Sequence, residues 1–162
     1  MSTIRTNAIT TTAGKTILQS TGSILQVVNN NTLGGSGEIT TTSSAYVNSG
    51  LSVSITPISS SSRLFVQWAG NVKFVGGGGD NGIAIRMYRD NVTINSTNDN
   101  LFYRSDAGAQ NHHTSCCINH YVNANSTAAT TFSIWFSAQW EGTAVITRDW
   151  GTCQFTVWEI SA

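Results

Sequence analysis

Charged residues are scarce in this sequence. Asp, Glu, Lys and Arg together make up 10% of the 162 residues, whereas an average soluble domain has about 25%. Serine, threonine, asparagine and glycine take their place. This composition is a poor match for a cytosolic enzyme, and it suits the surfaces of extracellular and virion β proteins.

Three further features are absent, and each absence argues against a class of protein. The formal net charge is 0, so no basic face is available to bind nucleic acid. No apolar run approaches the roughly 18 residues of a membrane-spanning helix. The beginning of the chain, MSTIRTNAIT, has no apolar segment of the kind found in signal peptides. We therefore expect a single domain with no membrane insertion and no nucleic-acid partner.

The cysteines are Cys116, Cys117 and Cys153. Neighbouring cysteines rarely bridge each other because the geometry is strained, and on a strand their side chains point to opposite faces. A bridge from Cys153 to one of the pair remains an alternative. We interpret all three as reduced, small, buried residues, which is consistent with synthesis in a cytoplasm.

The most informative segment is LSVSITPISSSSRLFVQWA, residues 51–69. Apolar and polar residues alternate strictly up to Ile55, as in a strand with one dry face, and Pro57 cannot donate to a β ladder. Alternation resumes after the serines, in 63–69, where Phe65 lies on the second face. The first strand should therefore have one face in water, and the second should be covered on both faces.

The rest of the chain continues this pattern without a helical period. About eight to ten short strands separated by turns are typical of an all-β sandwich or barrel, and we predict an antiparallel jelly-roll β-sandwich. The last strand, 153–160, is apolar on both faces and should lie within a sheet. The predicted core consists of Leu51, Val53, Ile55, Leu64, Val66, Ile83, Ile85, Phe132, Ile134 and Phe136.

Two segments are predicted to be turns: the glycine run 76–79 and Asp90-Asn91. The glycine run 76–79 is not followed by Gly-Lys-Ser/Thr or by a helical pattern, so we interpret it as a surface turn and not as a phosphate-binding loop. Asp90-Asn91 should form a two-residue hairpin turn, since both residues tolerate positive φ.

The N-terminal segment 1–22 is too poor in apolar residues to fold alone. One interpretation is a flexible leader. The interpretation that we favour is an extended arm that trimerises or attaches to a larger assembly through Ile4, Ile9 and Ile17, followed by a head domain over 23–162.

Several segments resemble a known family. STGSILQVV, SGLSVSITPISSSSRLFVQ, ATTFSIWF and a closing strand ending in WEI occur in this order, and they are similar to the C-terminal heads of bacteriophage tail-fibre and virion-appendage proteins, of the cyanophage or marine phage type. The leader IRTNAITTTAGKTIL resembles the attachment segment that precedes such heads. The resemblance implies a jelly roll like the heads of complement and tumour-necrosis proteins, assembled as a homotrimer on the virion. Because no shaft is present, it favours a short appendage, knob or capsid decoration.

No residue pattern predicts catalysis, a cofactor or a bound metal. The Cys-Cys pair lacks the second Cys-x-x-Cys of a zinc site, and no nucleophile elbow accompanies the serines. We expect no enzyme activity, although the sequence leaves open a glycosidase pair because carboxylate separation is a three-dimensional property. The candidates considered were His112, His113, His120, Cys116, Cys117, Asp106 and Asp149.

Aromatic residues suggest a ligand-binding surface and, separately, an interface between protomers. Trp140 and Trp150, with Asn111 and His112, are the candidate site for a neutral host-surface glycan. The alternative is that these tryptophans cap the ends of the sandwich.

The candidate trimer interface consists of Phe65, Trp135, Trp158 and Ile160, since a sandwich buries only one face of each sheet. The residues alone would favour two-fold symmetry, and the preference for a trimer comes from the resemblance. Two functions remain open: a structural virion protein joined to other virion proteins by its arm, and a lectin-like receptor-binding module.

Overall fold

The computed structural model describes residues 21–32, 37–76, 81–94, 100–104, 112–147 and 153–162. Among these residues, none belongs to a helix long and apolar enough to cross a bilayer. The strands are β1 (Ile24–Thr32), β2 (Glu38–Thr41), β3 (Val47–Ile55), β4 (Arg63–Val75), β5 (Asn81–Arg89), β6 (Val92–Thr93), β7 (Asn100–Arg104), β8 (His112–Asn123), β9 (Thr130–Trp140), β10 (Thr143–Thr147) and β11 (Cys153–Ile160).

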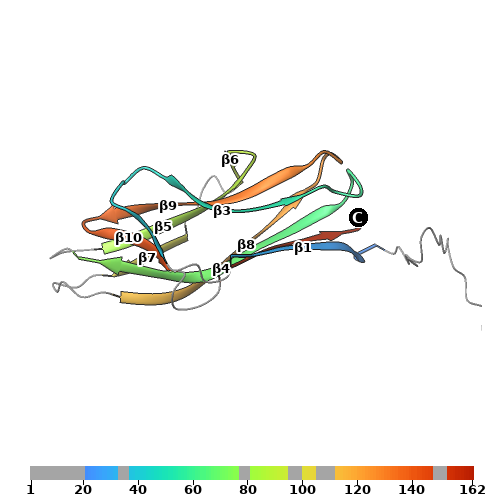
Figure 1. The fold of residues 1–162 in the computed structure, drawn as a ribbon. Coiled ribbons are helices and arrows are strands. Elements are labelled where there is room, and N and C mark those ends of the chain that lie inside the picture. Colours follow the sequence, from blue (N-terminus) through green and yellow to red (C-terminus); the bar gives the residue numbers. More distant parts are fainter. Residues whose placement is uncertain (1–20, 33–36, 77–80, 95–99, 105–111, 148–152) are drawn as a thin grey trace, which may run out of the picture.

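Two antiparallel sheets pack face to face (Figure 1). The first sheet has the order β1-β11-β4-β8, and β10 and β2 extend it beside the second half of β4. The second has the order β3-β9-β5, with β6 and β7 both beside β5. The chain alternates between the sheets as it passes through β1, β3, β4, β5, β8, β9 and β11. This is the strand order of a jelly roll, so the predicted all-β sandwich is confirmed.

Strand β4 is the centre of the first sheet. It pairs with β8 along one edge, and with β11 and then β10 along the other. Its inward side chains, Leu64, Val66 and Trp68, are fully buried. Its outward side chains, including Phe65, are only half-buried. The sequence predicted a strand covered on both faces, and in the single chain the outer cover is incomplete.

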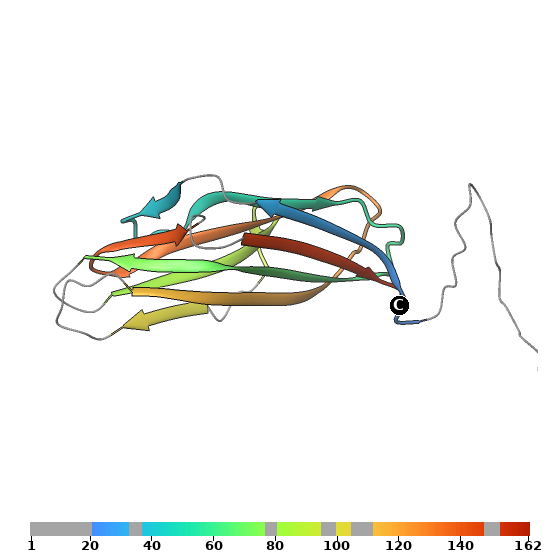
Figure 2. The same ribbon diagram turned by 60° about the horizontal axis from the view of Figure 1, so that its bottom comes forward.

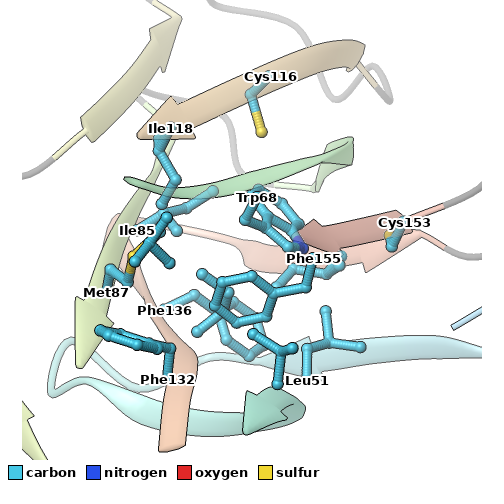
Figure 3. Packing of buried hydrophobic residues seen from close by; sticks show 14 of the residues in the cluster. Leu51, Trp68, Ile85, Met87, Cys116, Ile118, Phe132, Phe136, Cys153 and Phe155 are labelled. Atoms are coloured by element: carbon cyan, nitrogen blue, oxygen red, sulfur yellow. The ribbon is translucent and has the colours of Figure 1, made fainter. Parts of the chain in front are cut away.

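The core between the sheets contains all ten of the predicted core residues. Its largest side chains include Trp68, Phe132, Phe136 and Phe155, which meet between the layers (Figure 3). Burying each stabilises the fold by about 1.5–3 kcal/mol. Gly70 leaves room for the indole, because an added Cβ would lie 2.6 Å from Trp68 Cζ2 and 2.9 Å from Cys153 Sγ.

Most of the predicted strand boundaries agree with the structure. Strand β3 ends before Pro57, and β11 lies between β1 and β4 as predicted for the closing strand. The polar segment around His112 and His113 was expected to be a loop from its sequence, and this expectation was wrong. His112 and His113 pair with Phe74 and Lys73 as the first residues of β8, because pairing with a long neighbouring strand outweighs the low strand preference of a polar segment.

The start of the described chain, just before β1, lies beside the C-terminus at one end of the sandwich (Figure 2). Gly22 N donates to Ser161 O at 2.9 Å, and Ser161 N donates to Ser23 O at 2.9 Å. The Asp90-Asn91 hairpin turn is confirmed, since φ is 50° and 66° at these residues and Arg89 pairs with Val92.

None of the three cysteines forms a disulfide, as the sequence predicted. Cys116 and Cys153 are buried as predicted, but the prediction was wrong for Cys117, which is exposed because it points to the outer side of β8. Burial, with smaller contributions from Cys153 and Cys117, raises the pKa of the Cys116 thiol to about 12. The thiol is therefore protonated at neutral pH and packs as a small apolar side chain.

Candidate functional site

Strand β8 carries five of the residues considered for metal binding or catalysis. His112, His113 and Cys117 are exposed, Cys116 is buried and His120 is half-buried. Within the described residues, no group of three or more His, Cys, Asp or Glu side chains is arranged to hold a metal ion. Asp106 and Asp149 lie outside the described residues.

The most prominent surface feature is an apolar area on the outside of the first sheet. Tyr121, Phe65, Trp158 and Val27 are opposite one another on β8, β4, β11 and β1. The Phe65 ring centroid lies 4.7 Å from that of Tyr121 and 5.3 Å from that of Trp158. We call this surface the aromatic face, and its members are Ile24, Val27, Phe65, Tyr121, Trp158 and Ile160.

The aromatic face is open to solvent in the single chain. Ile24, Val27 and Tyr121 are 60%, 51% and 61% exposed, and the other three members are half-buried. Soluble monomers seldom expose a contiguous apolar patch of more than a few hundred Å². The arrangement therefore suits a surface covered by another protein surface.

Three of the four residues predicted for the trimer interface, Phe65, Trp158 and Ile160, lie together on this face. Ile24, Val27 and Tyr121 were not among the predicted interface residues. Alternation does place Tyr121 on the side of β8 opposite the buried Ile118. What it cannot show is that Tyr121 stands next to Phe65, because that depends on the register between β4 and β8.

Trp135 lies elsewhere, on the outer face of the second sheet. Its ring stacks on Tyr88 with centroids 4.6 Å apart and an interplanar angle of 26°, and its Nε1 donates to Ser133 Oγ at 3.1 Å. The thickness of the sandwich separates it from the aromatic face, so one contiguous interface on a single protomer cannot contain Trp135 and Trp158 together.

Two residues of the predicted glycan site can be placed. Trp140 is the last residue of β9 and is 57% exposed. His112 is the first residue of β8, and its ring is parallel to that of Phe74 at 6.2 Å. They lie on different sheets, at the end of the sandwich opposite the C-terminus and the start of β1. Asn111 and Trp150 lie outside the described residues, and the glycan site at this end stays a prediction.

The outer face of the second sheet contains a hollow of about 430 Å³. We call it the polar hollow, and it is lined by Asn48, Gly50, Ser52, Asp90, Asn91, Thr131 and Ser133. Strand β9 supplies its floor and the Asp90-Asn91 turn supplies one wall. The sequence analysis interpreted these residues only as strand and turn positions.

A β-bulge opens the hollow. Asn48 is opposite Trp135 and Ser52 is opposite Ser133, so Ser49–Leu51 are opposite Ile134 alone. Ser49 Oγ donates to Ile134 O at 2.6 Å and accepts from Leu51 N at 3.1 Å. Gly50 adopts φ of 77° at the bulge. Bulges of this kind bend the strand that carries the extra residues, and Asn48, Gly50 and Ser52 of this bulge line the hollow.

A carboxylate fixes the end of each sheet. Glu159 is fully buried and accepts from Ile58 N at 2.9 Å, Ser59 N at 3.0 Å and Gln26 Nε2 at 2.6 Å. Burial alone would raise the pKa of Glu159, but these hydrogen bonds together outweigh it and lower the pKa. The carboxylate thereby ties β1 and β11 to the turn between β3 and β4.

Asp90 fixes one corner of the polar hollow. Thr130 Oγ1 donates to it at 2.6 Å and Thr131 N at 2.8 Å. Desolvation opposes ionisation, but these two hydrogen bonds and the charge of Arg89 lower the pKa of Asp90 overall. Asp90 is therefore a carboxylate at neutral pH.

Residues 1–20 of the predicted arm, with Ile4, Ile9 and Ile17, lie outside the described residues. Gly22, which the sequence analysis placed at the end of the arm, is hydrogen-bonded to Ser161. Ile24 follows it as the first member of the aromatic face. Segment 1–20 therefore joins the head directly beside that face.

The sequence matches no family model and no curated protein. Among solved structures, a chain of the T=13 IBDV viral particle is similar over 96% of this chain and 40% of that chain, with 10% identity and a TM-score of 0.45. A chain of the T=1 particles derived from infectious bursal virus is similar over the same shares, with 12% identity and a TM-score of 0.45. Both of these neighbours belong to viral particles, and this chain spans 40% of the length of each.

Proposed function

We propose that this chain is a structural virion protein whose head assembles as a homotrimer through the aromatic face. The observation that carries the proposal is the row of apolar side chains across four strands, with Val27 and Tyr121 more than half exposed at its two sides. Closed rotational symmetry would cover such a patch without forming a filament. The number of subunits follows from the resemblance to trimeric phage heads.

A role on the virion is supported by the jelly-roll strand order, which is common in capsid and lectin domains, and by the charge-poor composition. The resemblance to tail-fibre and appendage heads adds a short tail-fibre tip, a knob or a capsid decoration as the type of structure. The protein would be made in the host cytoplasm, where free cysteines such as Cys116 persist.

Attachment to other virion proteins is assigned to the arm, through Ile4, Ile9 and Ile17. Because segment 1–20 joins the head beside Ile24, arms from neighbouring protomers would leave the trimer close together. The opposite end of the sandwich, with Trp140 and His112, would then point away from the particle and towards the host surface.

The mass of the intact chain in solution tests this proposal. Light scattering at micromolar concentration should give three times the protomer mass of 17.3 kDa. Tyr121→Glu should give protomers, because it places a charge in the aromatic face at an exposed position that the fold does not need. Val92→Glu is the matched control, since Val92 is 67% exposed on the second sheet, and it should remain a trimer.

A mass of 17.3 kDa for the intact chain would contradict the proposal. So would a trimer that Tyr121→Glu leaves unchanged. Thermal unfolding of each variant establishes that a change in mass does not come from unfolding.

A further inference from the structure

We propose that the polar hollow binds a neutral saccharide, with the stacked rings of Trp135 and Tyr88 as the platform beside it. This site lies on the sheet opposite the aromatic face, so it does not depend on the proposed trimer. It is also distinct from the glycan site predicted at Trp140 and His112, which lies at the end of the sandwich.

The hollow is built into the fold. Its volume of about 430 Å³ falls within the roughly 300–1,000 Å³ of small-molecule sites. The bulge at Ser49–Leu51 lies at the rim of the hollow, and Ser49 Oγ fixes the bulge by its hydrogen bond to Ile134 O. Bulges commonly occur next to functional sites, where they redirect side chains.

The lining has the hydrogen-bonding chemistry of a sugar partner. Asn48 and Asn91 offer amide donors and acceptors, and Ser52, Thr131 and Ser133 offer hydroxyls that both donate and accept. Asn48 Oδ1 accepts from Gly50 N at 2.8 Å, and Thr131 Oγ1 is hydrogen-bonded to Ser54 Oγ at 2.8 Å. Sugar hydroxyls both donate and accept, so they can pair with the remaining donor and acceptor positions. Asp90, held as a carboxylate by Thr130 and Thr131, adds a strong acceptor for hydroxyl donors.

The charge distribution disfavours an anionic ligand. The guanidinium of the neighbouring Arg89 donates to Asn123 O at 2.7 Å and Ala124 O at 2.6 Å, and its Nε donates to Thr130 Oγ1 at 2.9 Å. Arg89 is therefore engaged by the loop after β8, and none of the lining residues is Lys, Arg or His. Arg89 Nε lies 3.9 Å from Asp90 Oδ2, so this cation already balances the Asp90 carboxylate. A phosphate, a sulfate or an acidic sugar would meet that carboxylate with no further cation among the lining residues.

An aromatic platform adjoins the polar groups. Trp135 is opposite Asn48 and Tyr88 is opposite Ser133, and Trp135 Nε1 donates to Ser133 Oγ at 3.1 Å. Both residues are partly buried on this outer face. The apolar C–H side of a pyranose can lie on such rings while its hydroxyls reach the hollow, because Trp and Tyr combine an apolar face with a polar group.

A printed array of neutral and acidic glycans, probed with the intact chain, tests the ligand class. We expect binding to neutral glycans, unchanged by EDTA. Calorimetry with the glycan that gives the strongest signal then measures affinity for the variants. Absence of neutral-glycan binding, preference for acidic glycans, or loss of binding in EDTA would overturn the proposal.

Two substitutions test the location. Asn91→Gly keeps the positive-φ turn but removes an amide from the wall, and it should weaken binding roughly three- to tenfold, as expected for one hydrogen bond. Asn125→Gly is its matched control, because Asn125 has φ of 61° on an exposed turn outside the hollow. It should leave the affinity unchanged.

Ser52→Phe should fill the hollow and abolish binding, and Thr40→Phe, on exposed β2, should not. Trp135→Leu should weaken binding while light scattering shows an unchanged mass. If Ser52→Phe and Asn91→Gly bind as well as the unmodified chain, or if Trp140→Ala abolishes binding in their place, the site is not the polar hollow.

Discussion

The two outer faces of the sandwich differ although both sheets have the same alternating pattern and share one core. The aromatic face presents apolar side chains across β8, β4, β11 and β1. The opposite face presents amides, hydroxyls and one carboxylate around a hollow. The comparison shows that alternation determines which residues leave the core, while the identity of those residues determines whether the outer face suits a protein partner or a polar ligand.

Strand regularity reinforces the difference. Register is continuous between β4 and β8 and between β4 and β11, so Tyr121, Phe65 and Trp158 form an unbroken row. In the second sheet the register between β3 and β9 shifts between Asn48 and Ser52. A regular ladder keeps side chains in contact, whereas a bulge separates them and leaves a depression.

The largest expected effect comes from placing a charge at the centre of the aromatic face. Trp158→Asp should dissociate the assembly or prevent folding, because it removes the ring packed on Phe65 at 5.3 Å and introduces a carboxylate beside it. Trp135→Asp is the equivalent change on the other face and should leave the mass unchanged. Light scattering measures both, and the comparison fails if both variants behave alike.

Deletion of residues 1–20 should separate attachment from assembly. The truncated chain should remain a trimeric head, because the aromatic face begins at Ile24, but it should no longer dock on the particle. Light scattering and co-sedimentation with particles provide the two readouts. A truncated chain of 17.3 kDa or less would show that the arm, and not the aromatic face, carries the assembly.

Alanine substitutions at two glycines compare how the interior of the first sheet and the rim of the hollow tolerate an added Cβ. Gly70→Ala should destabilise the fold by about 3 kcal/mol, the upper end of the usual cost of overpacking, since its Cβ would overlap Trp68 and Cys153. Gly50→Ala meets no atom within 4 Å, and only the positive φ costs about 1 kcal/mol. Urea unfolding at a fixed protein concentration measures both, and equal losses would contradict the packing around Trp68.

Substitutions of the two hydrogen-bonded carboxylates, Glu159 and Asp90, should differ by a smaller amount in their effect on the free energy of unfolding. Glu159→Gln should cost about 1.5–3 kcal/mol, because an amide cannot accept from all the donors around it in the buried site. Asp90→Asn, at an exposed turn, should cost less.

The pKa of Glu159 is lowered from 4.5 in the folded chain. The contribution of Glu159 to the free energy of unfolding is therefore complete above pH 4.5, and it is lost as the pH falls through the folded-state pKa. The free energy of unfolding, measured with urea between about pH 3 and about pH 7, should fall with decreasing pH for the unmodified chain. The same profile should be flatter for Glu159→Gln.

The smallest expected effect concerns His120 on the inner side of β8. Burial lowers its pKa from 6.5, so the folded chain favours the neutral imidazole. The contribution of neutral His120 to the free energy of unfolding is complete above pH 6.5, and it is lost as the pH falls through the folded-state pKa. His120→Gln should remove the dependence in this range. A profile that the substitution leaves unchanged would assign the loss to other groups.

The amino-acid sequence alone determined the fold class, most strands and the core. Alternation around Leu51, Val53 and Ile55, and again around Leu64 and Val66, is a local property, and hydrophobic burial then permits one inward face. Pro57 and the Asp90-Asn91 turn were equally readable, because a missing N–H donor and tolerance of positive φ belong to single residues.

Only the tertiary structure decided which outward residues become neighbours. Tyr121, Phe65 and Val27 come from distant segments and meet through register, and Trp135 separates from Trp158 because their strands belong to different sheets. The polar hollow depends on a bulge in β3. Gly50 is compatible with a bulge, but the sequence does not show which residue of β9 the extra residues oppose. Register and bulges are set by pairing between strands, which is a property of two segments at once and cannot be read from either alone.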